Sequence, residues 1–600
     1  MKTNPSNKPV EKPRSKKELT LRGIPASPGI SIGCVHLLKA TEEEIHPRKI
    51  APSEVKTELA RFEHALAVSR EAIERSREKA TALAGIAVGK IFDAHLMILE
   101  DIVFREQVET RVKREQFSVD YIVFDVLGRN IEMMESQDGE LFRERAADIR
   151  DVRQRLLRSL RGEGDIMPNE PKTPVILVAA DLSPTSALHI DRNLVKGIAT
   201  DTGGLTSHTA ILARSMNIPS VVGLGDLSTR VESGDPIIIN GNSGKVLIHP
   251  TADSGKEYKQ KQDRYLKFMK SLENLREKPA ETTDGHKIAV WGNIELPLEA
   301  ESVLAHGGTG IGLFRSEFLF LTRESVPSED EQFDTYDKAA DIMAPYPVII
   351  RTFDLGGDKI HHTINLQKEK NPFLGYRAIR VSLSRRDLFR AQLRAMLRAS
   401  SRGNVRIMFP FISGLEELRE AKAVVKEAAE ELAGSKVPIE EQIKVGVMIE
   451  LPSAAMLADK LSEECDFFSI GTNDLVQYMV AADRGNDMVS AYYRSFHPAV
   501  IRMIQWTVKA AHKNNTPVGL CGELGANPIA TPLLVGLDID EISTNCAFIP
   551  EIKKIVRAMS YADCKRITHR VLKLGTALEV SEYLESQLKK RLADLPIWFN

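Results

Sequence analysis

The sequence predicts a multidomain α/β protein: an α/β domain with an inserted all-helical subdomain, followed by a C-terminal (β/α)8 barrel. Two observations lead to this fold class. Apolar residues recur at helical spacing over a long segment that lies between two groups of strand-like runs. Eight further strand-like runs alternate with helical patterns in the second half of the chain, as a (β/α)8 barrel requires. An open doubly wound sheet is the alternative, but no strand is followed by a glycine-rich dinucleotide fingerprint.

The composition is that of an ordinary globular protein, with 42% hydrophobic and 27% charged residues. A formal net charge of −2 gives no reason to expect nucleic acid or an anionic membrane as a partner. No apolar run reaches the roughly 18 residues of a membrane-spanning helix. The five cysteines lack the spacing of a metal site or a disulfide framework. Met1–Thr20 also lacks the apolar core of a signal peptide. We therefore expect a cytoplasmic protein without membrane insertion.

The first domain is expected to be discontinuous. Residues 1–20 are basic and contain several prolines, which predicts a disordered tail. Residues 21–40 contain a turn at Gly23–Gly29 and then a strand, and strand-like runs resume within residues 166–250. The helical periodicity of residues 41–165 separates these two parts. The simplest account is one α/β domain that is made of 21–40 plus 166–250 and interrupted by a helical insert.

The rest of the chain begins with a charged segment. Residues 251–282 are rich in Lys and Glu without a strand pattern, which predicts a linker helix. Residues 283–600 then form the barrel. Its strands are expected at 288–293, 310–314, 347–352, 405–409, 444–449, 467–470, 517–521 and 541–544.

The segment GGLTSHTAILAR at 203–214 joins a glycine turn to a helix. It places His208 at the helix N-terminus, where free N–H groups and the positive end of the dipole favour an anion such as phosphate. The same field disfavours imidazolium, so we expect a neutral, nucleophilic ring near pH 7. Taken alone, the segment is equally compatible with a helix that Thr206 or Ser207 caps and in which His208 has no chemical role.

Charged and reactive residues fall at the predicted C-terminal ends of the barrel strands, where such barrels carry their active sites. They are Arg315, Arg351, Glu450, Asn473, Asp474 and Cys521, with Arg377 and Arg484 in the loops that follow. Carboxylates and an amide suit Mg²⁺ that is held partly by substrate oxygens. Arginines suit a small substrate with phosphate and carboxylate groups. A thiol at the barrel mouth could protonate carbon, although a lone cysteine is more often a core residue.

Nine long motifs extend over most of the chain. They are RERAADIRD at 143–151, GGLTSHTAILAR at 203–214, GLFRSEFLF at 312–320, RTFDLGGDK at 351–359, NPFLGYRAIR at 371–380, GVMIELP at 446–452, DFFSIGTNDL at 466–475, DRGND at 483–487 and CGEL at 521–524. Together they resemble enzyme I of the bacterial phosphotransferase system, the phosphoenolpyruvate–protein phosphotransferases among the PEP-utilising enzymes. The resemblance departs at Leu205, where many members carry a basic residue.

The resemblance implies a role for each candidate residue. In the family, the histidine matching His208 is phosphorylated at Nε2 by phosphoenolpyruvate bound in the barrel, and the residue matching Cys521 donates a proton. Thr206 is expected to support the histidine. The implied Mg²⁺ ligands match Glu450 and Asp474. The implied substrate-binding residues match Arg315, Arg351, Asn473, Asp474 and Arg484, with Arg377 nearby.

The resemblance also implies a partner for each domain. The α/β domain of 21–40 plus 166–250 would be a swivelling phosphohistidine domain. It would pass its phosphoryl group to a histidine of the phosphocarrier protein HPr, which docks on the helical subdomain of 41–165. The barrel of 283–600 would bind phosphoenolpyruvate and form a homodimer. The implied reaction is the first step of the sugar phosphotransferase system, with release of pyruvate.

Three other functions share some of these features. A dikinase or phosphoenolpyruvate synthase uses the same histidine and barrel, but it also needs an ATP-binding domain, for which the sequence leaves no room. A nitrogen-related phosphorelay regulator often carries an N-terminal sensory domain, and none is expected here. A catalytically silent scaffold would not need the complete set of His208, Glu450, Asp474 and Cys521.

Overall fold

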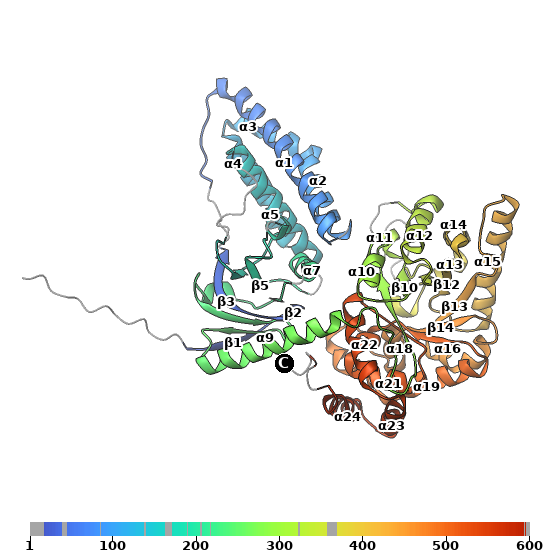
Figure 1. Ribbon diagram of the computed structural model, residues 1–600. Helices are drawn as coiled ribbons and strands as arrows, with labels where there is room; N and C mark the ends of the chain where they lie inside the picture. The colour runs from blue at the N-terminus through green and yellow to red at the C-terminus, as the bar shows by residue number, and fades with distance from the viewer. Residues whose placement is uncertain are drawn as a thin grey trace, which may run out of the picture. The chain divides into compact units, whose positions relative to one another are not determined.

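The computed structural model describes residues 17–38, 45–84, 86–136, 140–162, 171–188, 190–204, 207–216, 218–321, 325–356, 369–592 and 595. The chain forms two compact units, of which the first ends at Lys267 and the second comprises Phe268–Leu595. Figure 1 labels many of the helices and strands of both units.

The first unit contains an eight-stranded sheet in the order β1-β8-β7-β3-β4-β5-β6-β2. Its strands are β1 (Leu19–Arg22), β2 (Ile24–Ser27), β3 (Ile30–Leu38), β4 (Val175–Ala179), β5 (Val195–Thr200), β6 (Ser220–Val222), β7 (Pro236–Asn240) and β8 (Lys245–Ile248). The strands from β3 to β6 pair in parallel, and the outer strands pair antiparallel. All five residues of β4 are buried, as expected for a central parallel strand that is covered on both faces.

Two predictions at the start of this domain are wrong. Leu19 and Thr20, which the sequence analysis assigned to the tail of residues 1–20, belong to β1 and pair antiparallel with β8. Ile24–Ser27, predicted as a turn, form β2 and pair with β6. Both are edge strands with a single neighbour. An edge position tolerates Pro25, which has no N–H to donate, and it does not require the continuous apolar pattern of a buried strand.

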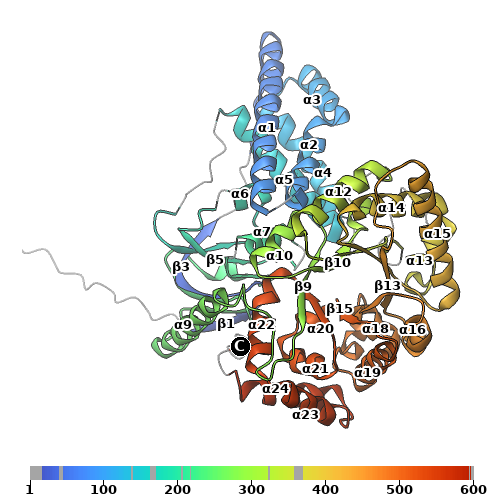
Figure 2. The same ribbon diagram turned by 45° about the vertical axis from the view of Figure 1, so that its right-hand side comes forward.

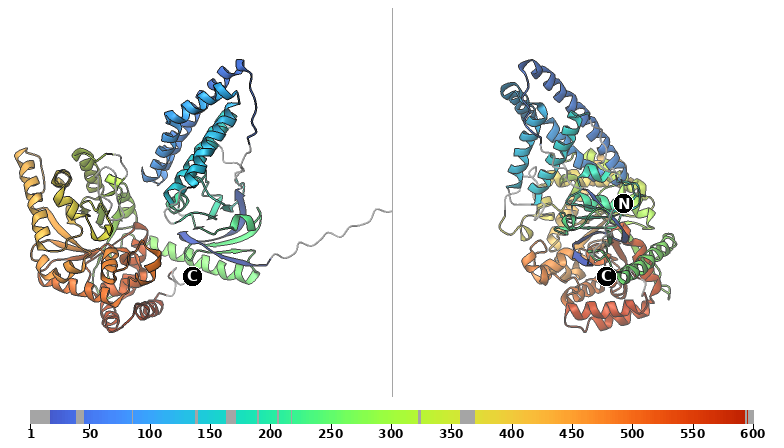
Figure 3. Two further views of the ribbon diagram at one scale, coloured as in Figure 1. Left: turned by 180° about the vertical axis from the view of Figure 1, so that it is seen from behind. Right: turned by 90° about the vertical axis from the view of Figure 1, so that its left-hand side faces the viewer.

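The helical insert follows β3. Its helices are α1 (Val55–Ala84), α2 (Ile86–Glu100), α3 (Ile102–Glu115), α4 (Val119–Glu135) and α5 (Glu140–Leu160). The blue and cyan helices of Figure 3 run side by side, and α1 packs on α2 and α4 on α5. Phe62, Ile73 and Ile122 lie fully buried in the core between them. The same apolar cluster includes Leu188 and Leu212, so the insert and the α/β domain share one core.

Four helices complete the first unit and lead to the second. They are α6 (Pro184–Leu188), α7 (His208–Ser215), α8 (Leu227–Arg230) and α9 (Ala252–Glu273). The first half of α9 packs on the sheet, because Tyr258 joins the cluster of Ile30 and Ile238. Gln262 Nε2 also donates a hydrogen bond to the Ile30 carbonyl at 2.9 Å.

The second unit is a closed barrel of parallel strands, visible in Figure 2 with its helices around it. The strands are β9 (Ala289–Ile294), β10 (Ile311–Arg315), β11 (Val348–Arg351), β12 (Val405–Phe409), β13 (Lys444–Ile449), β14 (Phe467–Ile470), β15 (Val518–Leu520) and β16 (Glu541–Thr544). The last strand pairs with the first, from Glu541 opposite Ala289 to Thr544 opposite Gly292. The predicted (β/α)8 barrel is therefore confirmed, and the open sheet is excluded.

The helices of the barrel unit differ widely in length. They are α10 (Glu299–Ala305), α11 (Phe318–Leu321), α12 (Glu329–Met343), α13 (Ile379–Ser384), α14 (Arg386–Ala399), α15 (Leu415–Gly434), α16 (Pro452–Met456), α17 (Ala458–Leu461), α18 (Thr472–Val480), α19 (Pro498–Lys513), α20 (Glu523–Ala526), α21 (Thr531–Gly536), α22 (Ile549–Ala558), α23 (Tyr561–Val571) and α24 (Ala577–Lys589). Within the described part of the chain, no helix combines the length and the apolar character needed to cross a membrane.

The barrel interior encloses one carboxyl group that the site does not use. Glu541 is buried, and a Cβ atom at Gly312 or Gly519 would lie only 2.3 or 2.1 Å from its carboxyl oxygens. A side chain at either position would therefore displace the buried carboxyl group of Glu541. Burial raises the pKa of Glu541 to about 8, against a smaller opposing effect of Arg406.

Candidate active site

The barrel places the predicted site residues at one end. Arg315 and Arg351 are the last residues of β10 and β11, and Glu450 directly follows β13. Asp474 and Cys521 come just after β14 and β15. Because all eight strands are parallel, their C-terminal ends open on the same mouth of the barrel, where the helix-connecting loops meet.

Arg351 is buried among acidic side chains. Its guanidinium donates a hydrogen bond to Glu317 and forms an ion pair with Asp354 at 3.2 Å. Burial lowers the pKa of Arg351, but the charges of Glu317 and Asp354 outweigh that effect and raise the pKa overall. The guanidinium therefore stays charged at the floor of the mouth.

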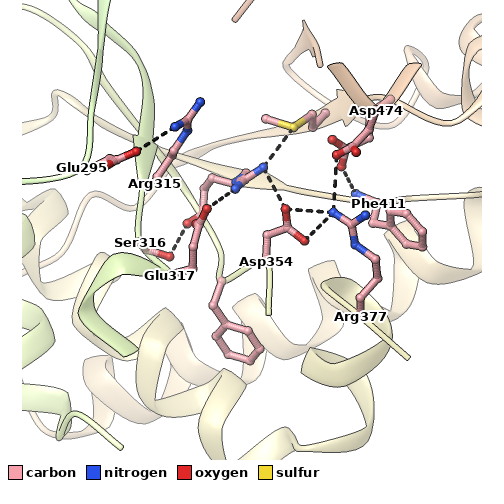
Figure 4. Close-up of polar contacts among 12 residues, drawn as sticks. Glu295, Arg315, Ser316, Glu317, Asp354, Arg377, Phe411 and Asp474 are labelled. Carbon is pink, nitrogen blue, oxygen red and sulfur yellow. Dashed lines mark hydrogen bonds and ion pairs between the residues drawn. The ribbon is translucent and has the colours of Figure 1, made fainter. Parts of the chain in front are cut away.

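Arg377 joins two aspartates (Figure 4): Asp354 in the loop after β11 and Asp474 in the first turn of α18. Its Nη2 donates to both oxygens of Asp354, at 3.0 and 3.1 Å, and to Asp474 Oδ2 at 3.4 Å. The guanidinium also lies over the ring of Phe411, 4.7 Å from its centroid. With only 3% of its surface exposed, Arg377 orients the carboxylates more directly than it can reach a ligand in the mouth.

Glu450 is held by the backbone of the neighbouring loop. Its Oε1 accepts a hydrogen bond from the Phe411 N–H at 2.6 Å. Burial and the negative charges of Asp474 and Asp354 raise the pKa of Glu450 well above its ordinary value. A cation in contact with this carboxyl group would stabilise its ionised form.

The residues present fit a divalent cation. Asp474 Oδ1 is buried and has no hydrogen-bond partner among the described residues, so one carboxylate oxygen is left for a ligand. Four buried carboxyl groups (Glu317, Asp354, Glu450 and Asp474) face two buried guanidiniums (Arg351 and Arg377), a formal excess of two negative charges. Across the described ranges, no three His, Cys, Asp or Glu residues are grouped as a metal site. A cation at Glu450 and Asp474 therefore needs further ligands from substrate or water.

The remaining polar residues line the outer part of the mouth. Arg315 is 39% exposed and donates to Glu295 Oε1 at 2.7 Å. Asn473 Nδ2 donates to Glu523 Oε1 at 3.1 Å, and Asn473 Oδ1 accepts the Glu523 N–H at 2.8 Å. Arg484 is exposed, and its N–H donates to Gln477 Oε1 at 3.0 Å. These side chains are accessible to a ligand from solvent.

Cys521 lies beneath the mouth. Only 3% of its surface is exposed, and its carbonyl accepts a hydrogen bond from Asn293 Nδ2 at 2.9 Å. Burial raises the pKa of the Cys521 thiol to about 11, so the sulfur carries its proton near neutral pH. A buried, protonated thiol can donate a proton but is a poor nucleophile.

In the first unit, α7 begins at His208, as the sequence predicts. The cap is Ser207, whose Oγ accepts the Ala210 N–H at 3.3 Å and donates to the Gly204 carbonyl at 2.8 Å. Thr206 and the side chain of His208 lie outside the described residues. The backbone of His208 therefore occupies the first turn, where N–H groups point away from the helix.

Sequence reasoning gave no role to the acidic partners of the arginines. Asp354 and Glu317 each lie within three residues of a predicted site arginine, but their pairing with Arg351 depends on where β10 and β11 end in space. The one sequence feature that could have indicated them is the acidic residue in each motif, Glu317 in FRSEF and Asp354 in RTFD. Glu295, the partner of Arg315, gave no comparable signal.

Family models and curated relatives match most of the chain. Residues 22–145 match the family model "PEP-utilising enzyme, N-terminal", residues 171–244 the model "PEP-utilising enzyme, mobile domain", and residues 269–561 the model "PEP-utilising enzyme, PEP-binding domain". The phosphoenolpyruvate-protein phosphotransferase of Bacillus sp. (strain S) is 41% identical, over 95% of this chain and 98% of its own. That of Bacillus subtilis (strain 168) is 40% identical, over 95% and 100%. A solution structure titled "Enzyme I (nEIt)" shares 40% identity over 41% of this chain and 99% of its own, with a TM-score of 0.34.

The barrel, its arginine–carboxylate site and the mobile α/β domain together define a PEP-utilising enzyme. These enzymes use a divalent metal, in keeping with the acidic excess at the barrel mouth. The chain belongs to the phosphoenolpyruvate-protein phosphotransferase family, the transferases of EC 2.7.3.9, which carry out PEP-dependent phosphotransfer as enzyme I of the phosphotransferase system.

Proposed function

We propose that this enzyme transfers the phosphoryl group of phosphoenolpyruvate to its own His208 and then to a histidine of HPr, with release of pyruvate. This would be the first step of the sugar phosphotransferase system. The observation that carries the proposal is the cluster of buried arginines and carboxylates at the C-terminal mouth of the barrel. Such a cluster matches a small substrate that carries both phosphate and carboxylate groups and comes with a divalent cation.

The substrate would be held mainly by charged side chains. Arg315, Arg351 and Arg484 bind the anionic oxygens of phosphoenolpyruvate, and Asn473 and Asp474 complete the substrate site. Glu450 and Asp474 hold Mg²⁺, and Arg377 keeps Asp474 in place. When bound, Mg²⁺ withdraws charge from the phosphoryl and enolate oxygens.

Transfer itself needs a nucleophile and a proton donor. A neutral ring nitrogen of His208 attacks phosphorus, so that an N–P bond forms while the bond from phosphorus to the enol oxygen breaks. The electron pair of that bond leaves with the enolate. The Cys521 thiol gives its proton to the methylene carbon, which yields pyruvate, and the resulting thiolate regains a proton from solvent. Thr206 would support the His208 ring or its phosphorylated form.

The domains take on separate tasks in this proposal. The helical subdomain of 41–165 docks HPr, and the α/β domain of 21–40 plus 166–250 carries the phosphohistidine. The segment 251–282, which contains α9 (Ala252–Glu273) and is not helical to its end as predicted, links it to the barrel of 283–600, which binds phosphoenolpyruvate and forms the homodimer. The setting is the cytoplasm. The matches to a "mobile domain" at 171–244 and a "PEP-binding domain" at 269–561 support the separation of the phosphohistidine domain from the barrel.

A coupled pyruvate assay tests the proposal. The full chain is incubated with phosphoenolpyruvate and Mg²⁺, either without HPr or with excess HPr. We expect a single limited release of pyruvate without HPr, continuous release with excess HPr, and neither after chelation of the metal. A parallel incubation with ATP and pyruvate should form no phosphoenolpyruvate. ATP-dependent formation of phosphoenolpyruvate would instead indicate a synthase, and pyruvate release without any phosphoprotein would contradict the proposal.

A further inference from the structure

A buried amide on α14 has every hydrogen-bonding group occupied. Gln392 is fully buried, and its Oε1 accepts the Phe353 N–H at 2.9 Å. Its Nε2 donates to Ser316 Oγ and to the Tyr336 hydroxyl, each at 3.0 Å. These three bonds use one acceptor and both amide hydrogens, which fixes the orientation of the side chain.

Two of these bonds end at the strands that carry the arginines. Ser316 directly follows Arg315 at the end of β10, and its hydroxyl donates to the Arg351 carbonyl at 2.6 Å. Phe353 lies two residues after Arg351, the last residue of β11. The Gln392 amide therefore links the two strand ends. It bonds the Phe353 N–H after β11, and it bonds the hydroxyl of Ser316 after β10, which itself donates to the Arg351 carbonyl of β11.

The third bond anchors the amide from behind. The Tyr336 hydroxyl, which accepts from Gln392, donates to Gln332 Oε1 at 3.3 Å. Gln332 Nε2 in turn donates to the Pro327 carbonyl at 3.0 Å. Tyr336 and Gln332 both lie on α12, and each is at most 1% exposed. The hydroxyls of Ser316 and Tyr336 each accept one hydrogen bond from Gln392 and donate another. The bonds therefore run outward from the amide along both branches, and each donor has an acceptor.

We infer that Gln392 is a positioning residue for the phosphoenolpyruvate site, which holds the strand ends so that Arg315 and Arg351 present their guanidiniums to the same substrate. The inference rests on the proposed function of these two arginines. Gln392 itself is fully buried behind the strands and touches no ligand. Gln392 fixes the distance and angle between the guanidiniums of Arg315 and Arg351, which lie at the ends of adjacent strands. Small errors in this geometry weaken substrate binding.

A loss of the amide should therefore weaken substrate binding selectively. Gln392→Met keeps the length of the side chain, but the Phe353 N–H loses its acceptor and Ser316 Oγ loses the donor that bonds it. The strand ends would then shift to find other hydrogen-bond partners. We expect the KM for phosphoenolpyruvate to rise about tenfold, which is the size of one lost bond of this kind. The kcat at saturating substrate should change much less, because the reacting groups are unaltered.

The matched control is Asn404→Leu. Asn404 is also a buried amide in the barrel, and its Nδ2 donates to the Ala340 and Tyr346 carbonyls at 2.9 and 3.0 Å. It precedes β12 and so lies at the opposite end of the barrel from the site. Both variants should lower the midpoint of thermal unfolding, but only Gln392→Met should raise the KM. An equal change of KM in both variants, or no change in Gln392→Met, would overturn the inference.

Two further variants keep the test decisive. If Gln392→Met does not fold, Ser316→Ala replaces it in the test, because it removes only the hydroxyl that bonds the Arg351 carbonyl. We expect the KM for phosphoenolpyruvate to rise several-fold in Ser316→Ala. An unchanged KM would overturn the inference. Arg351→Ala serves as the reference for the site. If Arg351→Ala raises the KM strongly while Gln392→Met and Ser316→Ala do not, the proposed function stands and the positioning role falls. If Arg351→Ala has wild-type kinetics, the proposed role of that arginine fails, and the positioning role fails with it.

Discussion

Arg377 donates a hydrogen bond to Asp474 Oδ2, while Asp474 Oδ1 remains buried without a partner among the described residues. One oxygen of this carboxylate is thus fixed by the protein, and the other is left for a ligand. The charge of Asp474 also helps to raise the pKa of the neighbouring Glu450. This pairing is the structural basis for the proposal that Glu450 and Asp474 hold the divalent cation.

Asp474→Asn should therefore lose metal-dependent autophosphorylation by at least about a hundredfold, because a neutral amide is a weaker ligand for a hard cation. The measurement is the rate of labelling by phosphoenolpyruvate as a function of metal concentration. The control is Asp466→Asn, whose carboxylate accepts the Val445 N–H at 2.7 Å at the start of β14, away from the mouth. A wild-type metal requirement in Asp474→Asn would show that Asp474 is not a ligand.

Cys521→Ala should separate phosphoryl transfer from proton donation. Transfer to His208 needs no thiol, so exchange of phosphate with the carrier should persist. Pyruvate formation should fall by about 10²–10⁴-fold, the usual contribution of a general acid. Pyruvate is measured in a coupled assay, with Cys564→Ala as the control, because that cysteine is equally buried but lies in α23. Wild-type pyruvate formation in Cys521→Ala would make the thiol a packing residue.

Alkylation of Cys521 should be slow at neutral pH and accelerate in base. Its pKa is raised to about 11 by burial, so the reactive thiolate is a minor form below that pH. The thiolate fraction should rise about tenfold per pH unit from neutral pH toward that pKa, and the rate of inactivation should rise with it. Phosphoenolpyruvate should protect against this inactivation. Inactivation rates measured between pH 7 and 10 check this. A flat profile would show that the thiol is already ionised in the protein.

Glu541→Gln should flatten the pH dependence of barrel stability. The pKa of Glu541 is about 8 in the folded protein and 4.5 ordinarily. Between these values the folded state binds more protons than the unfolded state, so stability falls as pH rises through this window and levels off above it. The slope is at most about 1.4 kcal/mol per pH unit. We expect the calorimetric unfolding midpoint of the wild type to fall relative to that of Glu541→Gln as the pH rises from 5 to 8. Parallel curves would show that the pKa of Glu541 is not raised in the folded protein.

Much of the barrel was predictable from its strands. The runs at 405–409 and 541–544 coincide with β12 and β16, because a strand inside a closed parallel barrel is buried along its length and flanked by polar loops. Parallel topology then brings every strand end to one mouth, which is why Arg351, Glu450 and Asp474 could be grouped without coordinates. Edge strands such as β1 and β2 carry no such pattern and were missed.

The supporting residues were harder to predict because their roles depend on tertiary contacts. Gln392 shows the one signal that was available. It lies on the apolar face of α14 between Phe389 and Met396, where a polar side chain is unusual unless it has buried partners. Which partners it finds depends on how α12 and α14 pack behind β10 and β11. The acidic partners of the arginines follow the same rule, since sequence shows a charge but not the side chain that neutralises it.

One labelling experiment tests whether the phosphoryl group passes from phosphoenolpyruvate to His208. The wild-type protein and His208→Ala are incubated with radiolabelled phosphoenolpyruvate and Mg²⁺, and the label is mapped by digestion. We expect an acid-labile, base-stable label on the wild-type peptide that contains His208, and none on the variant. The variant should still bind phosphoenolpyruvate, because the substrate site lies in the barrel. Label on His208→Ala, or acid-stable label on another residue, would contradict transfer of the phosphoryl group to His208.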